Sequence, residues 1–167
     1  YEGLTSYPAA RCVRILNPLS ADLNVMRQTL LFNTMEAVQL NANRRNGNLR
    51  LYEFGNCYFY DEAARDAEKP LSAYSEQYRL AIAVTGAAVP QSWNAKPQAS
   101  SFFTLRAVAE KLLRRFGLDI YALKCEPLQS DLFGDGISLS AGNGRELLQM
   151  GTVSRNIRRK LDVKQDV

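Results

Sequence analysis

The sequence predicts an α+β fold, in which a mostly antiparallel sheet carries helices on one side. Short segments in which apolar and polar residues alternate are typical of strands, and two longer segments repeat apolar residues at helical spacing. Proline, glycine and asparagine stand at the junctions between them. With 167 residues and no Pro/Ser-rich linker, the chain is long enough to bury one sizeable core, so we predict a single domain over 1–167.

These patterns predict nine elements along the chain. The strands are expected at Val13–Leu16, Leu49–Tyr60, Tyr78–Val84, Tyr121–Cys125, Ile137–Ala141 and Leu147–Val153, and the helices at Leu23–Leu40, Phe102–Phe116 and Ser154–Leu161.

A tight polar corner is predicted to join the first strand to the first helix. Pro18 lacks an N–H and restricts Asn17 to an extended conformation, so the strand must end there. Ser20 or Asp22 is expected to cap the helix, because either side chain can accept hydrogen bonds from its first free N–H groups. The apolar stripe of this helix comprises Leu23, Met26, Leu30, Leu31, Met35 and Val38.

The longest predicted strand, Leu49–Tyr60, carries large apolar residues on both faces. We therefore expect it in the middle of the sheet, covered on both sides. Gly55 interrupts it and predicts a bulge or the close approach of another backbone.

The clearest amphipathic pattern belongs to Phe102–Phe116. Ser100 or Ser101 is expected to cap its start, and Gly117 to supply the left-handed residue after its end. Lys111, Arg114 and Arg115 suit the negative end of its dipole. Before this helix, Trp93 lies in a loop that it is expected to anchor, unless it faces a partner.

The last two strands form a predicted hairpin. A type I′ turn at Asn143-Gly144 would define their register, and Phe133–Gly136 is expected to be a separate turn. The cross-strand pairs are then Leu139 with Leu148, Ile137 with Met150, Ser138 with Gln149 and Ser140 with Leu147.

Composition excludes several kinds of chemistry. The chain has no histidine, which excludes Ser/His/Asp and Cys/His catalysis and imidazole metal sites. The three cysteines are far apart, so neither a disulfide framework nor a zinc site is expected, and a reducing cytoplasm fits. The net charge of +4 is low for a dedicated nucleic-acid binder. No segment is long and apolar enough to span a membrane. The abrupt ends suggest an excised domain.

Two groups of charged residues were considered as sites. Glu53, Asp61 and Glu62 could supply paired carboxylates, but the last two are adjacent in a charged loop. Arg155, Arg158 and Arg159 share one face of the last helix and could contact phosphates, but exposed charge of this kind favours a solvated basic face.

Three motifs give the chain a family resemblance. They are I-L-N-P-L-S-x-D-L-x-V-M-R-x-T-L-L at Ile15–Leu31, N-x-N-R at Asn41–Arg44 and L-x-L-Y-E-F-G at Leu49–Gly55. Together they resemble the core module of bacterial phenylalanyl-tRNA synthetase beta subunits, and the resemblance extends from about Val13 to Asp166. It implies a class II aminoacyl-tRNA synthetase-like fold.

The resemblance also implies that this module is not catalytic. Catalytic class II relatives hold the ATP α-phosphate with an arginine at the end of a strand resembling Leu51–Tyr60, where this chain has Cys57-Tyr58-Phe59-Tyr60. We expect no catalytic, cofactor or metal residue in this domain. In that family the alpha subunit activates phenylalanine with ATP and Mg²⁺, within a cytoplasmic heterotetramer of two alpha and two beta chains that binds tRNA.

We expect Asn17, Pro18, Ser20, Met26 and Arg27 to shape the corner or to contact the alpha subunit. Two alternatives remain at this point. One is an adenylate-binding enzyme that uses Arg155 and the Tyr52/Tyr58 face, and the other is an RNA-binding module that uses Arg44, Arg45 and the last helix. Self-association of the isolated domain is a further possibility.

Overall fold

The computed structural model describes residues 3–20 and 23–167. Packing divides the chain into two compact units: Tyr1–Thr34 with Tyr52–Ala81 form the first, and Met35–Leu51 with Ile82–Val167 form the second. Three elements run through the boundaries between them, namely α1 (Leu31–Asn43), β1 (Leu49–Tyr60) and β2 (Tyr74–Thr85). Whether the whole chain folds as one domain stays a prediction.

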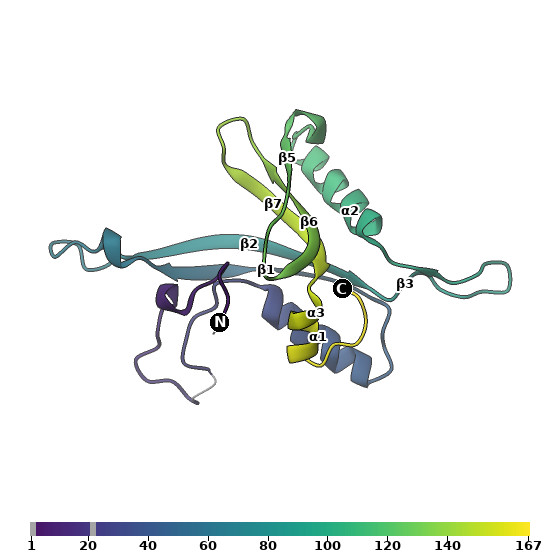
Figure 1. Cartoon of the computed structure of the whole chain (residues 1–167), viewed down its shortest axis with the longest axis horizontal. Coiled ribbons are helices and arrows are strands. Elements are labelled where there is room, and N and C mark those ends of the chain that lie inside the picture. The colour runs from purple at the N-terminus through teal and green to yellow at the C-terminus, as the bar shows by residue number, and fades with distance from the viewer. Residues whose placement is uncertain (1–2, 21–22) are drawn as a thin grey trace. The chain divides into compact units, whose positions relative to one another are not determined.

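The α+β class is confirmed, but the described strands form three small sheets and not the one sheet predicted. The first sheet is β1-β2, the second is β3-β4 (Ala87–Val89 and Gln98–Ala99), and the third is β5-β6-β7 (Lys124–Pro127, Phe133–Ser140 and Glu146–Val153) (Figure 1). Each sheet is made of strands that follow one another along the chain. Local connections therefore decide the pairing.

The bounds predicted for β1 are confirmed, whereas its central position is wrong. Among the described strands it pairs with β2 alone. Leu49, Cys57 and Phe59 on its odd-numbered face are buried, but Tyr52 and Phe54 on the other face are exposed. The strand therefore has one covered face, because side chains alternate across a strand. The predicted strand Tyr78–Val84 lies inside the longer β2.

The first helix starts later than predicted: α1 begins at Leu31 and not at Leu23. The preceding segment is extended, and a single antiparallel bridge joins Arg14 to Val25 in place of the predicted strand Val13–Leu16. Two backbone hydrogen bonds hold this bridge, from Met26 N to Val13 O (2.8 Å) and from Ile15 N to Asn24 O (2.9 Å). Helical spacing of apolar residues is overridden here by backbone pairing.

The predicted cap at Ser20 is therefore wrong, and Asp22 lies outside the described residues. The side chain of Thr29 accepts a hydrogen bond from Leu31 N (3.2 Å) at the observed start of α1. The first helical backbone bond runs from Thr34 N to Leu30 O (3.1 Å).

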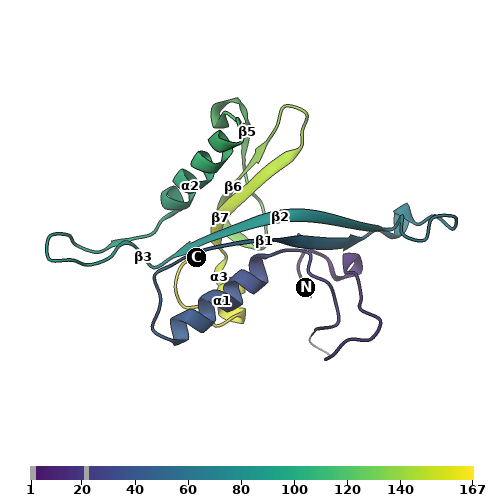
Figure 2. The same cartoon turned by 180° about the vertical axis from the view of Figure 1, so that it is seen from behind.

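The core of the second unit is formed by residues of α2 (Phe102–Arg115), of β6 and β7 and of the 3₁₀ turn at Ile120. Figure 2 shows α2 beside the β5-β6-β7 sheet. Its buried residues are Ala109, Leu113, Ile120, Leu139 and Met150. The predictions for α2 are confirmed to within one residue. Ser101 caps the helix in a reciprocal arrangement with Thr104, and Gly117 has a φ of +74°.

The hairpin register is confirmed at three of the four predicted pairs, but the turn is wrong. Ser140 faces Glu146, and Leu147 is left without a partner between this pair and the Leu139/Leu148 pair. Ala141 N bonds to Arg145 O across a three-residue loop (2.9 Å), and Gly144 has a φ of +80°. This is the loop in which a left-handed glycine follows a type I turn. The extra loop residue shifts the register by one, and the bulge at Leu147 restores it.

Three further boundaries complete the comparison. The strand expected at Tyr121–Cys125 starts later, at Lys124, because a short 3₁₀ helix covers Ile120–Ala122. Phe133–Gly136 is not a turn but the first half of β6. The final helix, α3 (Arg155–Lys160), follows the prediction with Ser154 as its cap.

Two glycines allow β6 and β7 to approach closely, since Gly136 and Gly151 stand opposite each other. A Cβ on Gly151 would lie 2.5 Å from the carbonyl oxygen of Asp135 and 2.9 Å from the Cα of Gly136. Backbone atoms cannot yield as the end of a flexible side chain does. The close pairing of β6 with β7 at this point therefore depends on these two residues having no side chain.

We predict that Gly151→Ala destabilises the chain by roughly 1–3 kcal/mol, as overpacking generally does. Thermal unfolding followed by circular dichroism should show a midpoint lower by about 2–4 °C for each kcal/mol. Gly142→Ala is the matched control, because a Cβ there would meet no atom within 4 Å. Equal midpoints for the two variants would contradict the prediction.

Candidate functional site

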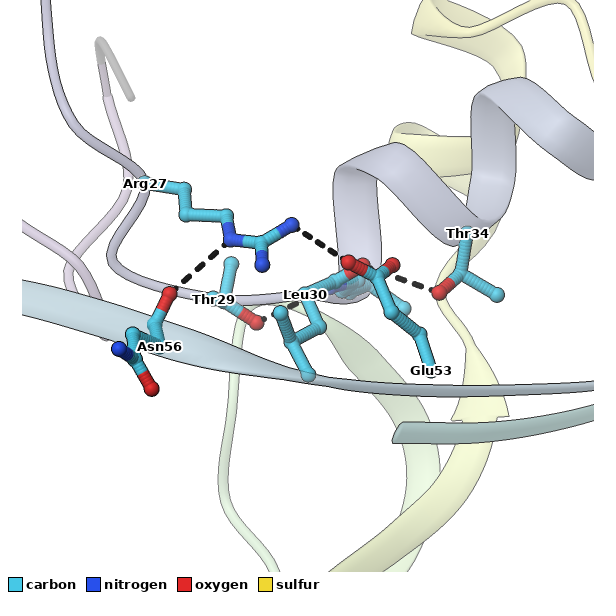
Figure 3. A network of polar contacts seen from close by, with 7 residues as sticks. Arg27, Thr29, Leu30, Thr34, Glu53 and Asn56 are labelled. Carbon is cyan, nitrogen blue, oxygen red and sulfur yellow. Dashed lines mark hydrogen bonds and ion pairs between the residues drawn. The ribbon is translucent and has the colours of Figure 1, made fainter. Parts of the chain in front are cut away.

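Arg27 attaches the segment before α1 to β1 through both its backbone and its side chain. Its Nε donates to the carbonyl oxygen of Asn56 (3.0 Å), and its Nη1 forms an ion pair with Glu53 Oε1 (2.5 Å) (Figure 3). Its own carbonyl accepts a hydrogen bond from Tyr58 N (2.9 Å). Gly55 leaves room for this guanidinium, which a Cβ at that position would strike. The sequence suggested that another backbone approaches Gly55, but the nearest neighbour of Gly55 is the side chain of Arg27.

The five corner candidates are separated in the structure. Met26 and Arg27 lie in the segment that bonds to Val13 and β1, whereas Asn17, Pro18 and Ser20 are exposed in the loop closed by the Arg14/Val25 bridge. Leu16 and Leu19 in this loop are 92% and 99% exposed. The motif Ile15–Leu31 thus attaches to β1 through Arg27, whereas its first residues include the exposed Leu16 and Leu19.

The covered face of β1 forms the core of the first unit. Leu30, Cys57 and Phe59 are buried together, and Tyr7 and Ala81 pack against them. The guanidinium of Arg79 lies 5.2 Å from the centre of the Phe59 ring, and that of Arg11 lies 5.9 Å from it. Cations at such distances are attracted by the face of an aromatic ring.

The other face of this ribbon is aromatic. We define the aromatic face as Tyr52, Phe54, Tyr58 and Tyr60 of β1 with Tyr74 and Tyr78 of β2. Phe54 and Tyr78 stack at a centroid distance of 6.1 Å, Tyr52 meets Phe54 edge-on at 6.1 Å, and Tyr60 lies 5.3 Å from Tyr74. Tyr52 and Tyr78 are 75% and 73% exposed. Sequence alternation placed the β1 members on one face, but it predicted that they would be covered.

The carboxylates near the aromatic face are already hydrogen-bonded. Glu76 accepts from the Asn56 amide, and Glu62 accepts from the Tyr60 hydroxyl. The Tyr60 bond lowers the pKa of Glu62 and raises the pKa of Tyr60, because it stabilises the carboxylate and the neutral phenol. Within the described ranges, both cation–ring contacts involve Phe59 and not this face. The surface is therefore aromatic, and the carboxylates beside it are hydrogen-bonded but keep their negative charge.

The carboxylates considered for catalysis have structural contacts. Glu53 pairs with Arg27, Asp61 caps the 3₁₀ helix that follows it, and Glu62 bonds to Tyr60 and Arg65. In the part of the chain that the structure describes, no three His, Cys, Asp or Glu side chains are grouped to hold a metal ion. The described helices also include none long and apolar enough to cross a membrane.

The three arginines of α3 do not act as one exposed cluster. Arg158 pairs with Asp166 (2.6 Å), donates to Val153 O (3.2 Å) and has a side chain only 13% exposed. Arg155 and Arg159 are exposed. The expectation that Trp93 anchors its loop is wrong, since Trp93 is 96% exposed.

Comparison with known proteins gives this architecture a family. The family model described as "Phenylalanyl tRNA synthetase beta chain CLM domain" matches residues 2–167. The chain belongs to this family. The resemblance derived from the motifs between Ile15 and Gly55 is thereby confirmed.

Several relatives support the assignment to the CLM domain family. The chain is 42% identical over its whole length to a phenylalanine–tRNA ligase beta subunit of Bacteroides thetaiotaomicron, 41% to one of Bacteroides fragilis and 38% to one of Porphyromonas gingivalis. In each case it covers 20% of the relative. The chain thus spans about a fifth of the length of these relatives.

We predict that Arg27 and Glu53 are energetically coupled in this CLM domain. Arg27→Ala should destabilise the chain by about 1–2 kcal/mol, because the Asn56 carbonyl and the Glu53 carboxylate both lose a partner. A double-mutant cycle with Glu53→Ala, measured by urea unfolding, should give a coupling energy of about 1 kcal/mol.

Arg27→Lys is the matched variant, and it should rescue only part of this loss, since an ammonium cannot reproduce the two directed bonds of a guanidinium. If Arg27→Ala changed neither stability nor subunit assembly, the anchoring role of Arg27 would be wrong.

The cysteines should differ in reactivity. Cys57 is fully buried and burial raises the pKa of its thiol, although Arg79 and Arg27 act in the opposite direction, whereas Cys125 is exposed. Because the thiolate is the reactive form, Cys125 should be the one thiol that a disulfide reagent labels rapidly in the folded chain. Cys125→Ser should abolish this rapid phase. In denaturant, all three thiols of the unmodified chain should react. Rapid labelling of Cys125→Ser would contradict this assignment.

Proposed function

We propose that the chain is a non-catalytic, class II synthetase-like module of a phenylalanyl-tRNA synthetase beta subunit, and that it packs against the alpha subunit of that enzyme. The assembled enzyme would attach phenylalanine to its tRNA with ATP and Mg²⁺ in the cytoplasm, and tRNA would be bound by the assembly. Membership of the CLM domain family supports the assignment to the beta subunit.

The aromatic face is the observation that carries the packing role. Tyrosine and phenylalanine are enriched where proteins contact one another, since they bury much area at a small cost in conformational entropy. Four of these rings are exposed by 48% or more, namely Tyr52, Phe54, Tyr74 and Tyr78. A contiguous exposed apolar patch of this kind is typical of an interaction site.

The composition of this face favours a protein partner over a phosphate-bearing one. Its carboxylates are satisfied internally, and the guanidinium groups of Arg11 and Arg79 lie over Phe59. Arg79 also donates to the hydroxyl of Tyr7 (3.2 Å). Stabilising a transferring phosphoryl group requires a cation directed at it. Arg50 shares the even-numbered side of β1 with Tyr52 and Tyr58, and its guanidinium donates to the carbonyl oxygen of Ala88 (2.9 Å). This argues against the adenylate-binding alternative.

The difference from catalytic class II relatives favours a non-catalytic role. The resemblance expects a phosphate-binding arginine in the part of β1 that contains Phe59. Phe59 is only 8% exposed, and the guanidinium groups of Arg11 and Arg79 lie over its ring. The residues present on this face do not suit ATP or Mg²⁺. The RNA-binding alternative is also weakened, because Arg158 is engaged with Asp166.

Mixing the purified chain with the cognate alpha subunit tests the proposal. We expect a defined mixed complex by light scattering after size-exclusion chromatography. Tyr52→Ser/Tyr78→Ser should weaken this complex at least about tenfold, because truncating aromatic anchors at an interface commonly costs 2 kcal/mol or more.

The matched control is Trp93→Ser/Tyr121→Ser, which removes two aromatic side chains that are 96% and 80% exposed elsewhere. This control should leave the affinity unchanged. A folded chain that forms no complex with the alpha subunit would overturn the proposal. A chain that instead forms a homodimer through the aromatic face would assign that face to self-association.

A further inference from the structure

A second candidate surface lies within the second unit, along the solvent side of α2. It is an open groove of about 520 Å³ lined by Ile82, Val108, Lys111, Leu112, Arg114 and Arg115. We call it the α2 groove. Three of its residues are aliphatic and three are cationic, but its surface is mostly apolar, so the cationic residues contribute mainly their hydrocarbon stems and flank an apolar groove.

The helix carries two different apolar stripes. Ala109 and Leu113 face the core of the second unit. Val108 and Leu112 are displaced from them around the helix and belong to the groove, where Val108 remains 39% exposed. Residues three and four apart lie side by side on a helix surface, which places Lys111 and Arg115 beside this second stripe. The aliphatic floor and the cations therefore form one continuous surface.

The cations of the groove have no carboxylate partner among the described residues. The only acidic residue of α2, Glu110, is paired with Arg106 (2.9 Å), and the other ion pairs of the described chain lie outside the helix. Lys111, Arg114 and Arg115 stand near the carboxyl end of the helix, where the dipole favours positive charge. That preference accounts for the charge but not for the exposed aliphatic floor beside it.

We infer that the α2 groove binds an acidic segment of the alpha subunit, with one large apolar side chain on Ile82, Val108 and Leu112 and carboxylates on the three cations. Charge complementarity selects the acidic partner, and the aliphatic floor selects a polypeptide. The groove lining contains no aromatic ring on which a base could stack. This inference rests on the proposed packing against the alpha subunit, but it concerns a different surface from the aromatic face.

Charge reversal in the groove is the first test. The variant Lys111→Glu/Arg114→Glu/Arg115→Glu should bind the alpha subunit at least about tenfold more weakly than the unmodified chain, and the affinity of the unmodified chain should fall as NaCl rises from about 50 to about 500 mM. The matched control is Lys96→Glu/Arg145→Glu/Lys164→Glu, which changes the net charge equally at exposed sites. Circular dichroism confirms that each variant is folded.

Because acidic residues near the end of α2 could unfold the helix, cross-linking provides a second test. In a Cys125→Ser background, Val108→Cys places one exposed thiol in the groove, since Cys12 and Cys57 are buried. A short thiol-to-amine cross-linker added to the complex, followed by peptide mass spectrometry, identifies the segment that it reaches. We expect that segment of the alpha subunit to carry at least two carboxylates beside a large apolar residue.

The outcomes separate this inference from the proposed function. A complex weakened by the groove variant and not by the control, with the expected cross-link, supports the inference. Equal binding by both variants, equal weakening of both, or a cross-link only to a second copy of the chain or to a segment without carboxylates overturns it while the complex itself stands. Absence of any complex with the folded chain overturns the proposed function, and the inference fails with it.

Discussion

The attachment of residues 24–30 to β1 through Arg27 is the constraint on which the first unit depends. A backbone hydrogen bond to Tyr58, a side-chain bond to Asn56 and an ion pair with Glu53 attach the segment at three points of the strand within six residues. This pinning brings Leu30 onto the buried face of β1 and leaves α1 to begin at Leu31. On the other face of the ribbon, Tyr52, Phe54, Tyr74 and Tyr78 are exposed among the described residues.

How far the sequence predicts the structure depends on the range of the interactions involved. The bounds of β1, α2 and α3 follow from alternation, periodicity and caps that lie within a few residues of one another. The start of α1 does not, because Leu23, Met26 and Leu30 have helical spacing while Val13 and Tyr58 supply the backbone bonds that prevent a helix. The single predicted sheet is wrong for another reason: alternation identifies each strand, but it does not show whether pairs of consecutive strands join into one sheet or stay separate.

The candidate surfaces show the same division. The motif around Asn17 and Arg27 identified the family, whereas the attachment of Arg27 to Glu53 and Asn56 is seen only in the structure, and a role of these residues in subunit contact stays a prediction. The sequence did not predict that Tyr52 and Tyr78 are exposed, because aromatic residues in a strand are expected to be buried unless it is known which elements pack on that face. The α2 groove was equally hidden, since Lys111, Arg114 and Arg115 are sufficiently explained by the helix dipole until the exposed Val108 is seen beside them.

The hairpin of β6 and β7 has a consequence for how this family can vary. Its three-residue loop and the bulge at Leu147 cancel, so that Leu139 still meets Leu148. A change of chain length at the tip can thus be absorbed within a few residues, before it reaches the buried rows. Insertions and deletions of one residue should accumulate at the tip of this hairpin among homologues without changing the pairs that are buried in the core. Such changes should not be tolerated near the Gly136/Gly151 pair, where the two backbones are in close contact.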